Sequence, residues 1–161
     1  MKLVRWWEAH FSIMEFLLSI LIGLSFALWS EFIDERRFLL SISADARLSI
    51  YGTMASLFGS LLGFNITAVS IVLGYSASDK LAVVRQSERY KDLWDVFKSA
   101  IRVLGVATVV SLVSLFIDKE VAPNLFVLYF TAFISVLSLF RVARCIWVLE
   151  KIIFLVTKDV R

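Results

Sequence analysis

Cysteine and histidine are almost missing from this sequence, in which Cys145 and His10 are the only residues of their kinds. A single cysteine excludes an internal disulfide and the paired thiols that four-helix thiol-oxidising membrane enzymes need. One histidine and one cysteine cannot build a zinc site by themselves, and the chain has no glycine-rich phosphate loop. The sequence therefore predicts a protein that is not an enzyme, with no metal or cofactor, and a buried free thiol at Cys145.

Turn-forming residues are equally scarce, with one proline and six glycines in 161 residues. Few turn signals predict few loops, so we expect a single domain built mostly of helix. Apolar residues are abundant instead, at 60% of the chain, against roughly 45–50% in soluble domains. The composition predicts an all-α integral membrane protein.

Four apolar runs lie between blocks of charge, at residues 11–30, 50–76, 101–117 and 124–140. Because about 20 apolar residues cross a bilayer core as a helix, each run predicts one transmembrane span of a four-helix bundle. No small-residue cleavage site follows the first run, so we expect it to be retained as a span. The fourth run continues without a helix breaker and predicts a helical tail over residues 141–161.

Lysine and arginine predict the orientation, since cytoplasmic loops accumulate them. With both termini and loop 77–100 inside, four of the 17 basic residues remain outside: Arg36, Arg37, Arg47 and Lys119. We therefore expect a multi-pass protein of the inner (cytoplasmic) membrane with both ends in the cytoplasm. In loop 77–100, Trp94 and Phe97 belong to a helically spaced apolar set, which predicts an amphipathic cytoplasmic helix along the membrane surface.

Small and hydroxyl-bearing residues follow one face of the second span at steps of three and four. They are Ser56, Ser60, Gly63, Thr67, Ser70 and Gly74. Close helix packing is the first interpretation, and pore lining by hydroxyls and exposed backbone is the second. Packing faces that surround the axis of an oligomer would satisfy both.

Asn65 lies on a different side of the same helix, near the middle of the membrane. An unpaired amide is unfavourable at that depth, so it needs a partner. We expect an interhelical hydrogen bond. The alternative is a ring of amides from several subunits that narrows a pore.

Glu15 is the acidic residue of the first span. Ser12 and Glu15 have the spacing of a capping box, and Phe11 and Phe16 that of a hydrophobic staple, so we expect Glu15 to fold back on a helix start. A proton or cation site is the alternative.

Further small residues align on the other spans: Ser19, Gly23, Ala27 and Ser30 on the first, Ala107, Ser111 and Ser114 on the third, and Thr131, Ser135 and Ser138 on the fourth. Interhelical contacts are the expected role. Asp118 continues the face of the third span to the outer mouth. We expect a solvated loop acid there, with attraction of cations as the alternative.

A basic stripe follows the fourth span if the helix continues, made of Arg141, Arg144, Lys151 and Lys158. Contact with anionic lipid headgroups is the first interpretation. An anionic regulator on the cytoplasmic side, such as a nucleotide or oligonucleotide, is the second, because clustered guanidinium and ammonium groups bind phosphates.

Four helices in one chain are too few to enclose a generous water path, so conduction would need subunits around an axis. The sequence therefore favours a homo-oligomeric pore or ion-channel-like effector in the lipid bilayer. Two alternatives stay open: a non-conducting interaction subunit of a larger membrane complex, and a small proton-coupled exporter centred on Glu15.

The tract LLGFNITAVSIVLGYSASDKL, residues 61–81, and the charged second loop resemble small four-span bacterial effectors of phage-defence systems. The Hailong type, gated by short DNA, is one example of such effectors. The resemblance implies an antiviral defence protein that disrupts the inner membrane when released. It covers most of the chain and carries over no functional residue.

Overall fold

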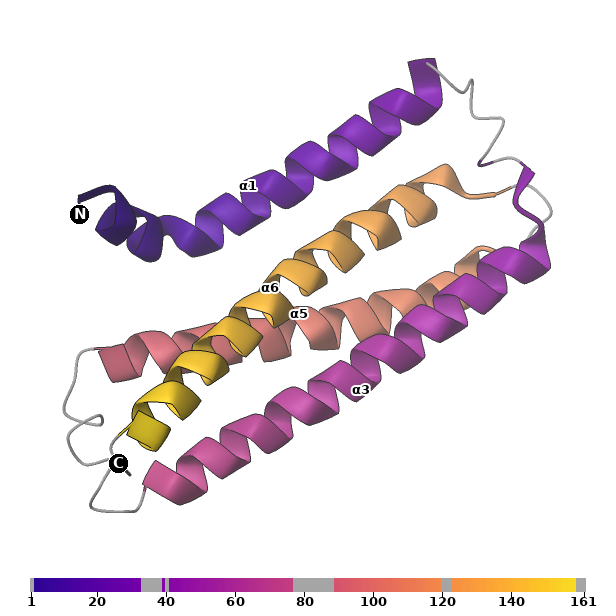
Figure 1. Cartoon of the computed structure of the whole chain (residues 1–161). Helices are drawn as coiled ribbons and strands as arrows, with labels where there is room; N and C mark the ends of the chain where they lie inside the picture. Colours follow the sequence, from indigo (N-terminus) through magenta and orange to yellow (C-terminus); the bar gives the residue numbers. More distant parts are fainter. Residues whose placement is uncertain (1, 33–38, 40, 77–88, 120–122, 159–161) are drawn as a thin grey trace.

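Four long helices make up the computed structural model, which describes residues 2–32, 39, 41–76, 89–119 and 123–158, without the side chains of 2–10, 12, 72, 75–76, 89–93 and 151–158. The helices are α1 (Lys2–Phe32), α3 (Ala44–Ser76), α5 (Arg89–Ile117) and α6 (Leu125–Lys158) (Figure 1). Each contains a segment long and apolar enough to cross a membrane: Ile13–Phe32, Ala44–Ile71, Trp94–Ile117 and Leu125–Glu150. The predicted all-helical, four-span, multi-pass architecture is confirmed.

The third and fourth helices extend well beyond the predicted apolar runs. α5 begins twelve residues before the predicted third run, and α6 continues through Arg141 without a break, as predicted for the tail. The described part of loop 77–100 is the start of α5 rather than a separate surface helix, and Phe97 is buried in the protein core. Residues 77–88 lie outside the described residues, and the tail is helical to Lys158.

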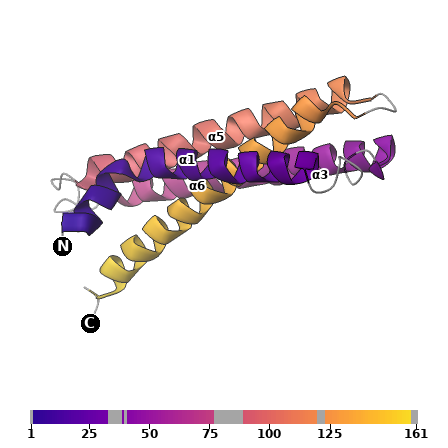
Figure 2. The same cartoon turned by 90° about the horizontal axis from the view of Figure 1, so that it is seen from above.

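The helices lie in a row rather than in a closed four-helix bundle. α1 packs mainly on α6, α6 packs on α5, and α5 packs on α3 (Figures 1 and 2). The start of α1 and the end of α6 lie at the same end of the molecule (Figure 1). In this row α1 and α3, which are consecutive in the sequence, occupy the two outer positions.

The core lies among α3, α5 and α6. Phe58, Leu104 and Ile134 belong to one buried cluster, to which each of the three helices contributes. A second cluster joins Phe97 of α5 to Cys145 of α6, and Cys145 is a buried free thiol, as predicted. No described side chain of α1 belongs to either cluster.

Small residues make the interhelical contacts that their spacing predicted. Ser30 of α1 lies 2.6 Å from the Tyr129 hydroxyl of α6, and Gly23 faces the ring of Phe133. Between α5 and α6 the hydroxyls of Ser114 and Thr131 are 3.1 Å apart. Small side chains let helix backbones approach closely in a membrane.

Candidate functional site

The six small residues of the predicted stripe on α3 are all exposed on the single chain. They are Ser56, Ser60, Gly63, Thr67, Ser70 and Gly74. A Cβ added at Gly63 or Gly74 would meet no atom within 4 Å. Among the described residues, the stripe therefore lies outside the packing contacts between helices of the chain.

Large apolar side chains border this α3 stripe on both sides. Leu57 and Phe64 flank it on one side, and Ile66 and Leu73 flank it on the other, all at least 49% exposed. The outward faces of the other helices carry such residues as well, as lipid contact requires. The stripe is thus a band of small and more polar residues within a surface of large apolar side chains that suits contact with lipid.

The stripe hydroxyls satisfy their protons within α3. Thr67 Oγ1 donates to the Gly63 carbonyl at 3.0 Å, and Ser70 Oγ donates to the Ile66 carbonyl at 2.9 Å. Their oxygen lone pairs stay on the outer surface of the helix. The band can therefore accept hydrogen bonds from water or from a neighbouring helix.

Asn65 faces the opposite way from the stripe. Its side chain is buried, and its Nδ2 donates to the Leu61 carbonyl one turn earlier in α3 at 3.0 Å. This bond lies within one helix, so it differs from the interhelical bond that we expected. Because Asn65 points into the chain, it does not share the exposed face with Gly63 and Thr67.

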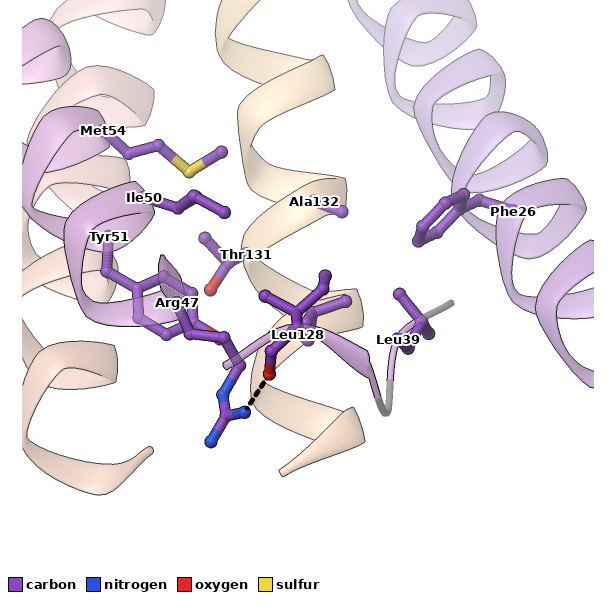
Figure 3. Close-up of a pocket in the computed structure, with 10 residues that line it drawn as sticks. Phe26, Leu39, Arg47, Ile50, Tyr51, Met54, Leu128, Thr131 and Ala132 are labelled. Atoms are coloured by element: carbon purple, nitrogen blue, oxygen red, sulfur yellow. Dashed lines mark hydrogen bonds between the residues drawn. The ribbon is translucent and has the colours of Figure 1, made fainter. Parts of the chain in front are cut away.

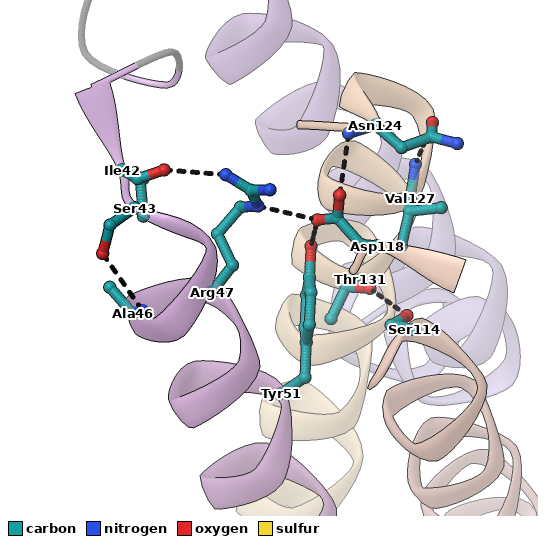
Figure 4. A network of polar contacts seen from close by, with 10 residues as sticks. All are labelled: Ile42, Ser43, Ala46, Arg47, Tyr51, Ser114, Asp118, Asn124, Val127 and Thr131. Carbon is teal, nitrogen blue, oxygen red and sulfur yellow. Dashed lines mark hydrogen bonds and ion pairs between the residues drawn. The ribbon is translucent and has the colours of Figure 1, made fainter. Parts of the chain in front are cut away.

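A buried polar network joins α3, α5 and α6 at the end of the molecule where Asp118 lies (Figure 4). Asp118 Oδ2 accepts from Arg47 Nε at 3.1 Å and from the Tyr51 hydroxyl at 2.8 Å. Asp118 Oδ1 accepts from the Asn124 backbone N–H at 2.9 Å. Arg47 also donates to the Ile42 carbonyl at 2.7 Å.

The expectation of a solvated acid at Asp118 is wrong. The side chains of both Arg47 and Asp118 are 1% exposed. A buried carboxylate needs a cation and several donors to offset its desolvation, and Arg47, Tyr51 and Asn124 supply them. Glu120, the next acid along the chain, lies outside the described residues.

Helix caps sit beside this network. Ser43 precedes α3 and accepts from the Ala46 N–H at 3.3 Å, while Asn124 precedes α6 and accepts from the Val127 N–H at 3.4 Å. Each residue occupies the N-cap position, where a side-chain oxygen satisfies a free backbone donor. The caps fix the starts of the two helices whose residues meet Asp118.

Glu15 is buried between α1 and α6 near the opposite end of the molecule. Its Oε2 lies 2.9 Å from Nη1 of Arg141 and 3.9 Å from Nη1 of Arg144. The Arg144 guanidinium also lies over the Phe11 ring, 4.7 Å from its centroid. Since α1 already begins at Lys2, the predicted capping box at Ser12 and Glu15 is wrong.

The Glu15 contact is an ion pair with poor hydrogen-bond direction. The 2.9 Å separation from Arg141 is short, yet neither Glu15 oxygen makes a hydrogen bond with acceptable angles. The two groups still attract each other, because Coulomb attraction depends on separation more than on angle. The pair therefore joins α1 to α6 electrostatically.

This pairing divides the predicted basic stripe of the tail. Arg141 is buried against Glu15, and Arg144 is partly exposed. The side chains of Lys151 and Lys158 lie outside the described residues. Arg141 thus has a protein partner in the position where we expected a lipid or ligand phosphate.

Two apolar hollows lie beside α1. The smaller, of about 160 Å³, is lined by Phe26 of α1, Tyr51 and Met54 of α3, and Leu128 of α6, together with Leu39 (Figure 3). The larger, of about 360 Å³, is an open groove between α1 and α6 that reaches from Phe16 to Tyr129. Both lie along α1, which packs mainly on α6.

Sequence reasoning missed the partners of the buried charges. Arg47 belonged to a set of outer basic residues, and Tyr51 carried no prediction. The available signal was the presence of one acid near the start of the first span and one at the end of the third. Helices that are neighbours in the membrane need cations at matching depths to balance such acids.

Comparison of the chain with protein-family models, with curated proteins and with solved structures finds no match.

Proposed function

We propose that the protein assembles into a homo-oligomer whose α3 helices surround an axis and conduct ions across the membrane. The exposed α3 stripe is the observation that carries this proposal. Five of its residues, from Ser56 to Ser70, lie within the span Ala44–Ile71. A transmembrane helix with such a face turned away from its own chain has a surface suited to other copies of itself.

The chemistry of the stripe supports a water-filled path more than contact with lipid. Hydroxyl oxygens and the backbone beside Gly63 can solvate water and ions, whereas acyl chains offer them no hydrogen bonds. The flanking side chains, such as Phe64, would pack between neighbouring α3 helices. Asn65 has no part in this path, because it is buried inside the chain.

Such a pore would act as a membrane effector. By the distribution of lysine and arginine it lies in the inner membrane with both ends in the cytoplasm. A role in bacterial phage defence, with release by an anionic signal, is supported only by the resemblance of residues 61–81 and the second loop to effectors of that kind.

Ion flux from liposomes that contain the purified protein tests the proposal. Gly63→Leu adds a large apolar side chain on the stripe, and Gly105→Leu is the matched control, since it makes the same change on α5, where an added Cβ also meets no atom within 4 Å. We expect Gly63→Leu to reduce flux roughly tenfold or more, because an apolar constriction empties a narrow path of water. Gly105→Leu should keep wild-type flux at matched incorporation.

Absence of flux from wild-type protein under every condition would instead favour the non-conducting interaction subunit. In that case the stripe packs against a different membrane protein, and the purified chain should migrate as a monomer in detergent. An exporter centred on Glu15 would show substrate-driven proton release that Glu15→Gln removes. The ion pair between Glu15 and Arg141 makes a structural role for this carboxylate the simpler interpretation.

A further inference from the structure

We infer that the junction of α1 and α6 binds one anionic phospholipid, with its phosphate at Arg144 and an acyl chain in the groove that begins at Phe16. Three separate features of this junction support the inference: an unequal charge count, an open groove of matching length, and the depth of the charged groups. None of them depends on conduction by the α3 stripe.

The first feature is the charge count. Among the described side chains of this junction, two guanidinium groups, of Arg141 and Arg144, lie within 4 Å of one carboxylate, that of Glu15. Arg141 takes the short contact at 2.9 Å, while Arg144 stays at 3.9 Å, beyond hydrogen-bond distance. A cation that is only partly balanced in a low-dielectric region attracts an anion.

Arg144 is also the accessible member of the pair. Its side chain is 19% exposed, compared with 8% for Arg141. The ring of Phe11 lies against its guanidinium group, and a guanidinium over an aromatic ring keeps N–H donors at its edge. These donors have the planar arrangement that binds phosphate oxygens.

The second feature is the open groove between α1 and α6. It is lined almost entirely by apolar atoms, with aromatic rings that include Phe126, Phe130 and Phe133 on α6. Along α1 it reaches from Phe16 to Ala27, roughly 16 Å at about 1.5 Å per residue. One leaflet of a bilayer is about 15 Å deep, half of the hydrocarbon core of about 30 Å. The groove therefore fits one acyl chain along its length.

The charged cluster and the groove adjoin. Glu15 directly precedes Phe16, whose ring meets Phe133 edge to face with centroids 5.9 Å apart. Phe133 and Arg144 lie on the same face of α6 within about 20°, at about 100° per residue, and roughly 16 Å apart along the helix at about 1.5 Å per residue. The Arg144 guanidinium nevertheless lies 3.9 Å from the Glu15 carboxylate, so a headgroup at Arg144 lies beyond the end of the groove that begins at Phe16.

The third feature is depth. Glu15 and Arg141 lie roughly 25 Å from the far ends of their spans, at Phe32 and Leu125, at about 1.5 Å per residue. In a hydrocarbon core of about 30 Å this places the cluster near the interface, where phospholipid phosphates are found. An anionic lipid supplies both the charge for Arg144 and the chain for the groove.

Native mass spectrometry of the purified full chain in detergent tests the site. Phosphatidylglycerol is titrated against phosphatidylcholine with the same acyl chains, and the dissociation constant of the first bound lipid is measured. We expect phosphatidylglycerol to bind more tightly to the wild type. Arg144→Gln should raise its dissociation constant about 10- to 100-fold, as loss of charge-assisted hydrogen bonds does.

Arg102→Gln is the matched control for charge, because Arg102 is exposed on α5 at a similar distance from the end of its span. It should leave the constant unchanged. A second pair of variants tests the groove. Leu24→Trp places a larger side chain in the groove, whereas Leu21→Trp changes a residue of the same helix that does not line the groove. Both leucines are about equally exposed, at 59% and 62%, so folding should tolerate both changes.

Two results would overturn the inference. One is an equal effect of Arg144→Gln and Arg102→Gln, which would mean that any interfacial arginine attracts the headgroup. The other is an equal effect of Leu24→Trp and Leu21→Trp, which would mean that the groove holds no chain. The arginine pair and the leucine pair are independent comparisons. If one variant fails to fold, the other pair still decides the inference.

Discussion

Replacing Asp118 with asparagine tests whether one buried carboxylate holds three helices together. The change keeps the size of the side chain but removes the charge that Arg47 faces at 3.1 Å. Arg47 is 1% exposed, so its guanidinium would stay buried without its counter-ion. Breaking a buried ion pair from one side costs about 3–5 kcal/mol. The NH2 group of asparagine would also direct its N–H donors at a donor group, either Arg47 Nε or the Asn124 backbone N–H, neither of which can accept a hydrogen bond.

The coupling free energy between Arg47 and Asp118 is best measured with a double-mutant cycle. Arg47→Met removes the cation and fills similar volume, and the double variant Arg47→Met/Asp118→Asn removes both charges. We expect the double variant to lose clearly less stability than the sum of the single variants, by about 2 kcal/mol or more, because it leaves no uncompensated charge in the buried site. Tyr51 and the Asn124 N–H donate to different oxygens of Asp118, so the amide oxygen keeps only one of these two hydrogen bonds.

Unfolding by SDS in mixed micelles, followed by circular dichroism, supplies the free energies. Asp45→Asn is the matched control, because Asp45 is an exposed acid in the first turn of α3. Its loss should cost no more than about 1 kcal/mol through the helix dipole. Additive effects of Arg47→Met and Asp118→Asn, within about 0.5 kcal/mol, would refute the coupling that the geometry implies.

The junction of α1 with α6 gives two further predictions. Ser30→Ala should lower the free energy of unfolding by about 1 kcal/mol, with no added loss in Ser30→Ala/Tyr129→Phe, because both changes remove the same hydrogen bond. Glu15→Gln should make α1 more susceptible to proteolysis in detergent than wild type, because Arg141 loses its counter-ion; unchanged protection of α1 in both Glu15→Gln and Glu15→Ala would contradict a role of this ion pair in holding α1.

Hydropathy was enough to predict the four helices, but the predicted membrane spans are shorter than the helices. A charged residue usually ends a predicted span, and this rule ended the fourth span before Arg141, although we expected the helix itself to continue to residue 161. In the folded chain Arg141 is balanced by Glu15 from another helix, so α6 continues. Local sequence carries no information about a partner that lies more than a hundred residues away.

The faces of the helices were more predictable than their neighbours. Three- and four-residue spacing identified the stripe on α3 and the packing faces near Ser30 and Ser114, because periodicity is a property of one helix. Which face meets which helix depends on the row order, and neither the exposure of the stripe nor the pairing of Arg47 with Asp118 follows from spacing. The capping prediction for Glu15 failed for the same reason, since a local pattern competed with a distant cation.

The position of α1 at one edge of the row has a consequence for how the chain is made. Its partner α6 is the last helix in the sequence, and the Ser30 and Tyr129 side chains that meet are 99 residues apart. At about 5–20 residues per second, a ribosome needs roughly 5–20 s to synthesise that interval. During this time α1 has lipid as its neighbour, while α3 and α5 can already pair. The exposed leucines of α1 allow this helix to stay in the bilayer without a protein partner until α6 is made. The Glu15 carboxylate gains its counter-ion, Arg141, only at that stage.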